Sequence, residues 1–153
     1  MKRALKKFVF VEPSSTHLHI YSRVTIPRLG SVLLATIMRG KGYDVRVYIE
    51  DIHDVDMSEV LSADLVAISA ITSTAPQSYR LADSVRAAGG VAVLGGTHVS
   101  FLPEEGLEHA DFVVRGEGEF AFQELVDAIQ AGGGFAKIQN LAYLVDGCPV
   151  NNP

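Results

Sequence analysis

Three short segments rich in glycine and small hydroxyl residues each follow an apolar, strand-like run. They are Ser69-Ala70-Ile71-Thr72-Ser73-Thr74, Gly95-Gly96-Thr97-His98 and Arg115-Gly116-Glu117-Gly118-Glu119. Paired glycines let backbone amides approach a flat or bulky ligand, and hydroxyls donate or accept hydrogen bonds without carrying charge. Each segment also has a purely structural explanation, because turns from strand to helix need glycine for their geometry. Together they predict a binding site built from small residues.

The elements that must position these segments are short β-rich runs separated by helical patterns. The runs are Phe8–Val11, Val45–Ile49, Leu65–Ser69, Val91–Leu94 and Phe112–Arg115. Strands alternating with helices are typical of a parallel sheet with crossover connections, and nearly continuous apolar runs indicate strands covered on both faces. We therefore predict a single doubly wound α/β domain, Rossmann-like or flavodoxin-like, with a five-stranded parallel sheet and helices on both faces. The three segments would then lie at one edge of the sheet.

The helical patterns have recognisable starts and stops. Predicted helices begin near Pro27–Leu29 and end at Gly40 or Gly42, lie around 57–61, run from Thr74 or Ala75 to Gly89-Gly90, start at Pro103, and cover Glu119–Ala131. In the first of them, four apolar residues share one face at helical spacing: Leu29, Val32, Leu33 and Ile37. In the third, Leu81 and Val85 are expected to face the sheet.

The C-terminal residues have a different pattern. Leu141–Val145 and Cys148–Val150 flank Asp146-Gly147, a favoured turn between antiparallel strands. We predict a C-terminal hairpin, with residues 1–135 as the binding domain and 136–153 as a hairpin or linker towards a further domain outside this sequence.

Composition and charge exclude several classes of function. The chain has 153 residues and a net charge of −5, so it offers no basic surface for nucleic acid or an anionic membrane. The first apolar run stops at Glu12-Pro13, too early for a signal peptide, and no later run approaches a membrane span. One cysteine, Cys148, leaves no internal disulfide or cysteine cluster. A cytoplasmic protein without nucleic-acid or membrane partners is expected.

The usual nucleotide and catalytic signatures are missing. The first strand is followed by Glu12-Pro13-Ser14-Ser15-Thr16-His17 and not by G-x-G-x-x-G, and there is no G-x-x-x-x-G-K-[ST]. Ser69 and Ala70 stand where a phospho-receiver domain needs an aspartate. His98 could be an acid–base group, a ligand or a residue that stabilises its loop. His17 and His19 could reach a bound metal, but a plain surface loop is the expected setting for both. No set of nucleophile, base and orienting group can be assembled, so no catalytic residue and no metal ligand are predicted.

The sequences of these loops resemble those of a known family of cofactor-binding domains. The sequence resembles the N-terminal cobalamin-binding domain of cobalamin-dependent radical S-adenosylmethionine enzymes, which include methyltransferases and proteins similar to the anaerobic magnesium-protoporphyrin ester cyclase. The resemblance is carried by Pro27-Arg28-Leu29-Gly30, Ser69 to Tyr79, Leu94-Gly95-Gly96-Thr97-His98, Pro103-Glu104-Glu105 and Val114-Arg115-Gly116-Glu117-Gly118-Glu119.

The resemblance implies cobalamin as the cofactor, with its nucleotide tail descending beside the sheet. The residues implied in binding are Ser69, Thr72, Ser73, Thr74, Gly95, Gly96, Thr97, His98, Gly116, Glu117 and Gly118. The D-x-H-x-x-G motif, which supplies an axial histidine to cobalt in mutases of the wider cobalamin-binding fold, is absent after the first strand. Asp51-Ile52-His53 matches its first three letters, but it follows the second strand and Asp56 replaces the glycine. Cobalt is therefore expected to be held without a protein histidine.

A second departure concerns the radical chemistry. The chain has no C-x-x-x-C-x-x-C motif, so S-adenosylmethionine and a [4Fe-4S] cluster would belong to a C-terminal catalytic domain of the same protein, outside this sequence. The chain alone is then not catalytic, and the whole protein would be an oxidoreductase or a methyltransferase.

Two other interpretations remain open at this stage. A flavodoxin-like domain could bind FMN or another small ligand, with Thr72-Ser73-Thr74 holding a phosphate. A degenerate domain could serve only for interaction or docking, without any ligand.

Overall fold

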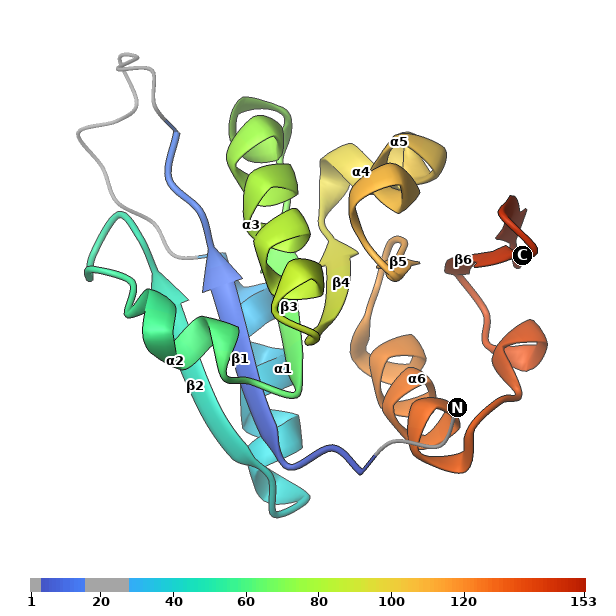
Figure 1. The fold of residues 1–153 in the computed structure, drawn as a ribbon, viewed down its shortest axis with the longest axis horizontal. Helices are drawn as coiled ribbons and strands as arrows, with labels where there is room; N and C mark the ends of the chain where they lie inside the picture. The colour runs from blue at the N-terminus through green and yellow to red at the C-terminus, as the bar shows by residue number, and fades with distance from the viewer. Residues whose placement is uncertain (1–3, 16–27) are drawn as a thin grey trace.

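A computed structural model of the chain describes residues 4–15 and 28–153 (Figure 1). Its strands are β1 Lys7–Glu12, β2 Asp44–Ile49, β3 Leu65–Ser69, β4 Val91–Gly95, β5 Phe112–Val114, β6 Leu141–Val145 and β7 Cys148–Asn151. Its α-helices are α1 Leu29–Gly40, α2 Met57–Leu61, α3 Ala75–Ala87, α4 Thr97–Phe101, α5 Pro103–His109 and α6 Glu119–Ala131, with short 3-10 turns η2 Thr72–Thr74 and η3 Phe135–Lys137. Pro27, expected at the start of the first helix, lies outside the described residues.

The strands form one sheet in the order β2-β1-β3-β4-β5-β6-β7. The pairs from β2 to β5 are parallel, whereas β6 pairs antiparallel with β5 and β7 antiparallel with β6. The prediction of a mostly parallel α/β sheet is confirmed, but the predicted number of strands is wrong, because the sheet has seven. Leu141 and Ala142 of β6 are fully buried. Pairing with β5 removes these apolar side chains from water, and β7 joins the same sheet because it pairs with β6.

Helices cover both faces of the sheet. Phe8 and Phe10 of β1 belong to the core under α1 and α6, whereas Val9 and Val11 of the same strand belong to the core under α2, α3, α4 and α5. Because successive side chains of a strand point to opposite faces, this division follows from the alternation along β1. Val85 of α3 is buried in the second core, as the sequence predicted.

Helix α1 packs on the sheet with a face other than its most apolar one. Leu29 is 79% exposed, and Val32 and Leu33 are also exposed. The buried residues are Ser31, Ala35 and Met38. Small side chains at 31 and 35 let the helix lie close to the strands, and apolar residues around most of its circumference make the hydrophobic pattern a poor guide to its orientation. The shared apolar face therefore does not mark the side that contacts the sheet.

The C-terminal end is fixed by hydrogen bonds. The buried Asn152 side chain donates to the carbonyl oxygens of Phe135 and Ile138, both at 2.7 Å. The backbone carbonyl oxygen of Asn152 accepts from Nη2 of Arg115. Arg115, which follows β5, is thus turned towards the C-terminal strands. No helix within residues 4–15 and 28–153 is long and apolar enough to cross a membrane.

Candidate functional site

The carboxyl ends of the parallel strands meet at one edge of the sheet, and the strand order reverses there. The chain passes from β1 outwards to β2, then returns to β3 on the other side of β1. Ligands of open doubly wound sheets bind beside this point, outside the carboxyl ends of the strands. A cavity of ≈ 160 Å³ lies at this edge, between the sheet and helices α1 and α6.

The floor of the cavity consists of side chains from one face of the sheet. Phe10 of β1 pairs in register with Ala67 of β3, which in turn pairs with Val93 of β4. One level nearer the strand ends, Ser69 and Gly95 pair with each other, and all five line the cavity. The floor is therefore apolar and made partly of small residues, with a hydroxyl near the strand ends. Within the described part of the chain, no group forms a hydrogen bond with that hydroxyl.

The walls of the cavity come from the first turns of two helices. Gly30 and Ser31 line it from α1, and Glu119 and Phe122 line it from α6. Ser31 is only 8% exposed. Amides in the first turn of a helix lack partners within that helix and carry partial positive charge, so both walls favour oxygen atoms of a ligand.

The two adjacent glycines after β4 have different roles. Gly96 has φ +100°, and a Cβ atom there would lie 2.6 Å from the carbonyl oxygen of Ala70. Only glycine fits this conformation and this close contact between the loops after β3 and β4. At Gly95, by contrast, the nearest atom to an added Cβ is the carbonyl oxygen of Val114 at 3.6 Å, an ordinary contact. Gly96 is needed by the fold, whereas Gly95 leaves room in the cavity.

A serine that sequence reasoning missed connects two of the glycine loops. The Ser100 hydroxyl donates to the carbonyl oxygen of Gly96 at 2.8 Å and accepts from the amide of Gly116 at 2.9 Å. Both glycines line the cavity. Ser100 therefore fixes the spacing between the loops that follow β4 and β5.

The structure brings together some of the predicted binding residues and separates others. Those that line the cavity are Ser69, Gly95, Gly96, Gly116 and Gly118. Those that the described structure does not place in its lining are Thr72, Ser73, Thr74, Thr97, His98 and Glu117. The chain turns away from the cavity after β3, because residues 72–74 form a 3-10 turn that leads into α3. The Thr74 hydroxyl accepts from the Ile71 amide of that same turn.

The cavity also has lining residues that the sequence did not predict. Phe10, Ala67 and Val93 were predicted only as strand residues, and Ser31 and Leu34 only as residues of a helix. Alternation along the strands could have grouped the first three with Ser69, but β1 is apolar on both faces and gives no sign of which face holds the cavity. In α1, the small residue Ser31 in the first turn could have indicated that this end of the helix lines a cavity.

Side chains of η2, α3, α4 and α5 that are not among the cavity-lining residues form a hydrogen-bonded group. Nδ1 of His98 lies 3.2 Å from the Thr72 hydroxyl, and its Nε2 lies 3.2 Å from a carboxylate oxygen of Glu105. The Tyr79 hydroxyl donates to that oxygen at 2.8 Å. Hydrogen bonds from Tyr79 and His98 hold the pKa of Glu105 below its usual range. Burial raises the pKa of Tyr79, and the hydrogen bond to Glu105 raises it further. Glu105 is therefore ionised at neutral pH.

Metal-binding side chains are not clustered in the described part of the chain, where no group of three or more His, Cys, Asp or Glu residues could hold an ion. Among the described residues that line the cavity, none is a histidine, and Glu119 is the one ionisable group. His17 and His19 lie outside the described residues.

The structure is a doubly wound domain with a cavity at the carboxyl ends of its parallel strands. The chain belongs to the B12 binding domain family, whose model matches residues 19–126. The family resemblance found in the sequence is thereby confirmed at the level of the B12-binding domain.

Relatives and solved structures agree with this membership. The chain is 32% identical over 162 residues to an uncharacterized methyltransferase of Pyrococcus horikoshii, covering 99% of this chain and 35% of the relative. It is 30% identical over 132 residues to the bacteriochlorophyllide d C-12(1)-methyltransferase of Chlorobaculum tepidum, covering 86% and 29%. The chain thus spans about a third of the length of these relatives.

Two solved structures share the fold. One is the radical S-adenosylmethionine methyltransferase TsrM of Kitasatospora setae with cobalamin and a [4Fe-4S] cluster bound, with a TM-score of 0.73, 20% identity, and coverage of 98% of this chain and 31% of that one. The other is the cobalamin-dependent S-adenosylmethionine radical enzyme OxsB with aqua-cobalamin bound, with a TM-score of 0.78, 16% identity, and coverage of 97% and 22%.

Proposed function

We propose that the cavity between the sheet and helices α1 and α6 receives the nucleotide tail of cobalamin, and that the chain is the cofactor-holding part of a methyl-transferring enzyme. The observation that carries this proposal is the cavity at the reversal of strand order, with small residues at its strand-end level. Membership of the B12 binding domain family supports it. The division of the chain near residue 135 stays a prediction.

The residues present fit the chemistry of the tail, which joins a flat apolar base to a ribose and a phosphate. The apolar floor of Phe10, Ala67 and Val93 suits the base. The hydroxyls of Ser31 and Ser69 and the partial positive charge at the N-terminal ends of α1 and α6 suit the polar part. Gly95 leaves the space that a side chain would fill.

We also propose that cobalt has no axial ligand from this chain. The D-x-H-x-x-G motif is absent after β1, and none of the described residues that line the cavity is a histidine. Bound cobalamin supplies a cobalt centre that can carry a methyl group. The chain's part is to bind the tail and orient the cofactor. Radical chemistry with S-adenosylmethionine and an iron–sulfur cluster would belong to a catalytic domain outside this sequence, as the names of the relatives and structural neighbours favour.

The FMN alternative has less support from the structure. It requires Thr72-Ser73-Thr74 to hold a phosphate, but these residues are not among those that line the cavity, and the Thr74 hydroxyl is bonded within its own turn. A purified protein that is yellow and has a flavin absorbance spectrum would support the FMN alternative.

The axial-ligand proposal can be tested by electron paramagnetic resonance. The chain is loaded with cobalamin and reduced to the cobalt(II) state, in which an axial nitrogen splits each cobalt line. We expect lines without nitrogen splitting, because neither the displaced tail nor a protein histidine would reach cobalt. Nitrogen splitting would contradict the proposal, and its loss in a single histidine variant would identify the ligand.

Replacing Ser69 tests the polar part of the site. Ser69→Ala should weaken cobalamin binding about five- to tenfold, the value of one hydrogen bond of about 1 kcal/mol, without changing the urea midpoint of unfolding. Equilibrium dialysis measures the affinity. Ser84→Ala is the matched control, because the Ser84 hydroxyl donates to a carbonyl within α3, away from the cavity. Equal affinities for all three proteins would remove Ser69 from the site.

A further inference from the structure

His98 links the loop that follows Ser69 to the loop that contains Gly96, and both of these residues line the cavity. Its amide donates to the carbonyl oxygen of Ala70 at 3.1 Å, and the amide of Ala70 donates to the carbonyl oxygen of Gly95 at 2.7 Å. Its side chain, 11% exposed, adds the contact with the Thr72 hydroxyl. The residue therefore joins the segment after β3 to the segment after β4 through both its backbone and its ring.

The partners of the ring fix its protonation pattern. Glu105 is ionised and can only accept, so His98 Nε2 must carry the hydrogen that it shares with Glu105. In the neutral ring Nδ1 is then an acceptor, and the Thr72 hydroxyl must donate to it. The Tyr79 hydroxyl donates to the same oxygen of Glu105. The hydrogen bonds thus run in one direction, from Thr72 through His98 to Glu105.

We infer that His98 and Glu105 are positioning residues for the cobalamin site. Through Thr72 they hold the loop after Ser69 and the loop that contains Gly96 at a fixed distance. This inference rests on the proposed function. His98 itself is not among the cavity-lining residues, whereas Ser69 stands three positions before Thr72 and Gly96 two positions before His98. A change at the ring therefore reaches the cavity through its neighbours in the chain, without direct contact with the cofactor.

The far side of the group is anchored to two helices. Tyr79 belongs to α3, and its ring stacks on that of His109 of α5 with centroids 4.5 Å apart and an interplanar angle of 9°. Nδ1 of His109 lies 2.9 Å from a carboxylate oxygen of Asp83 of α3. In Figure 1, α3 lies beside α4 and α5, so the network connects the loops to the helical layer. Glu105 is thereby a fixed support for His98.

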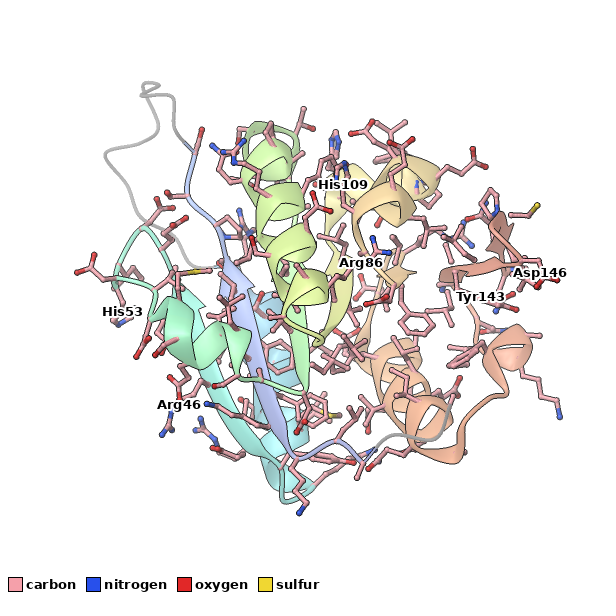
Figure 2. All side chains as sticks on the ribbon, in the orientation of Figure 1. Arg46, His53, Arg86, His109, Tyr143 and Asp146 are labelled. Carbon is pink, nitrogen blue, oxygen red and sulfur yellow. The ribbon has the colours of Figure 1, made fainter. Side chains whose placement is uncertain are left out.

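The first test needs no cofactor. Nitrogen NMR of the chain should show His98 as the tautomer with hydrogen on Nε2. In His98→Ala, the amides of residues 70 and 98 should exchange with solvent about tenfold faster, because the restraint on both loops is lost. His53→Ala is the control, since His53 is exposed in the loop after β2, far from His109 and α5 in Figure 2. The Nδ1 tautomer, or unchanged exchange in His98→Ala, would overturn the inference.

The second test measures cobalamin affinity. His98→Ala should weaken binding about tenfold, Glu105→Gln less, and His98→Asn should recover part of the loss, because its amide can stand in for Nδ1 at Thr72. In a Thr72→Val background the effect of His98→Ala should shrink, since both changes remove the same hydrogen bond. Full additivity, or affinity unchanged in His98→Ala, would overturn the inference. Should the wild-type chain fail to bind cobalamin, the proposed function fails, while the NMR and exchange results still decide the positioning role.

Discussion

Gly95→Val is expected to abolish cobalamin uptake while leaving the fold intact. Gly95 pairs in register with Ser69 and lies on the same face of the sheet as Val93, the face that forms the cavity floor. A valine side chain at this position projects into a cavity of only ≈ 160 Å³. The valine side chain and the nucleotide tail would compete for the same space. Overpacking a protein core by a comparable amount costs about 3 kcal/mol, and the same loss of binding free energy lowers the affinity about 100-fold or more.

The backbone should tolerate this change. The nearest atom to an added Cβ lies 3.6 Å away, and the backbone of Gly95 is in an ordinary strand conformation. Valine favours strands, so the free energy of unfolding measured with urea should stay the same or rise by about 0.5–1 kcal/mol. Gly133→Val, which lies outside the cavity, is the control that should bind normally. Wild-type affinity in a folded Gly95→Val protein would show that the ligand does not occupy this cavity.

Gly96→Ala should lower the free energy of unfolding by about 2–3 kcal/mol, the largest stability loss that we expect from a single methyl group in this chain. Gly96 has φ +100°, and a Cβ atom added there would lie 2.6 Å from the carbonyl oxygen of Ala70. Alanine must therefore accept a conformation that L residues rarely adopt and must also push apart the loops after β3 and β4. Because those loops directly follow Ser69 and Gly95, the last residues of β3 and β4, cobalamin binding should weaken as well.

The matched control for this variant is Gly116→Ala. Gly116 also has a positive φ, +60°, but no atom lies within 4 Å of an added Cβ. Its substitution should cost only the conformational strain, about 1 kcal/mol. Urea unfolding of both variants separates the strain from the contact. A loss no larger for Gly96→Ala than for Gly116→Ala would mean that the close approach to Ala70 does not constrain the fold.

Much of the fold could be predicted because its strands are short, apolar and separated by helices with clear ends. The place of the candidate site could be predicted from the topology, because loops after parallel strands meet at one edge of the sheet. Ser69, Gly95 and Gly116 line one cavity there, while their part in binding a ligand stays a prediction. The last two strands were expected, but their partner was not. The turn at Asp146-Gly147 indicates that Leu141–Val145 pairs with the strand that follows it. No feature of the sequence indicates that the other edge of this strand pairs with β5.

The orientation of side chains was harder to predict. In a strand such as β1, apolar on both faces, alternation does not show whether Phe10 or Val9 lines a cavity. The hydroxyls at Thr72 and Thr74 looked equivalent to that of Ser69, but the 3-10 turn directs the chain towards α3. The partnership of His98 with Glu105 joins two separate helices, and the sequence gives no local signal of it.

The most direct test of the account is the uptake of hydroxocobalamin by the purified chain, followed by gel filtration and a measurement of cobalt and protein in the same fractions. We expect about one cobalamin per chain to co-elute with a changed absorbance spectrum, and none to co-elute with Gly95→Val. A wild-type chain that is folded by circular dichroism but elutes without cobalt, at cobalamin concentrations well above those typical of cofactor binding, would contradict the account.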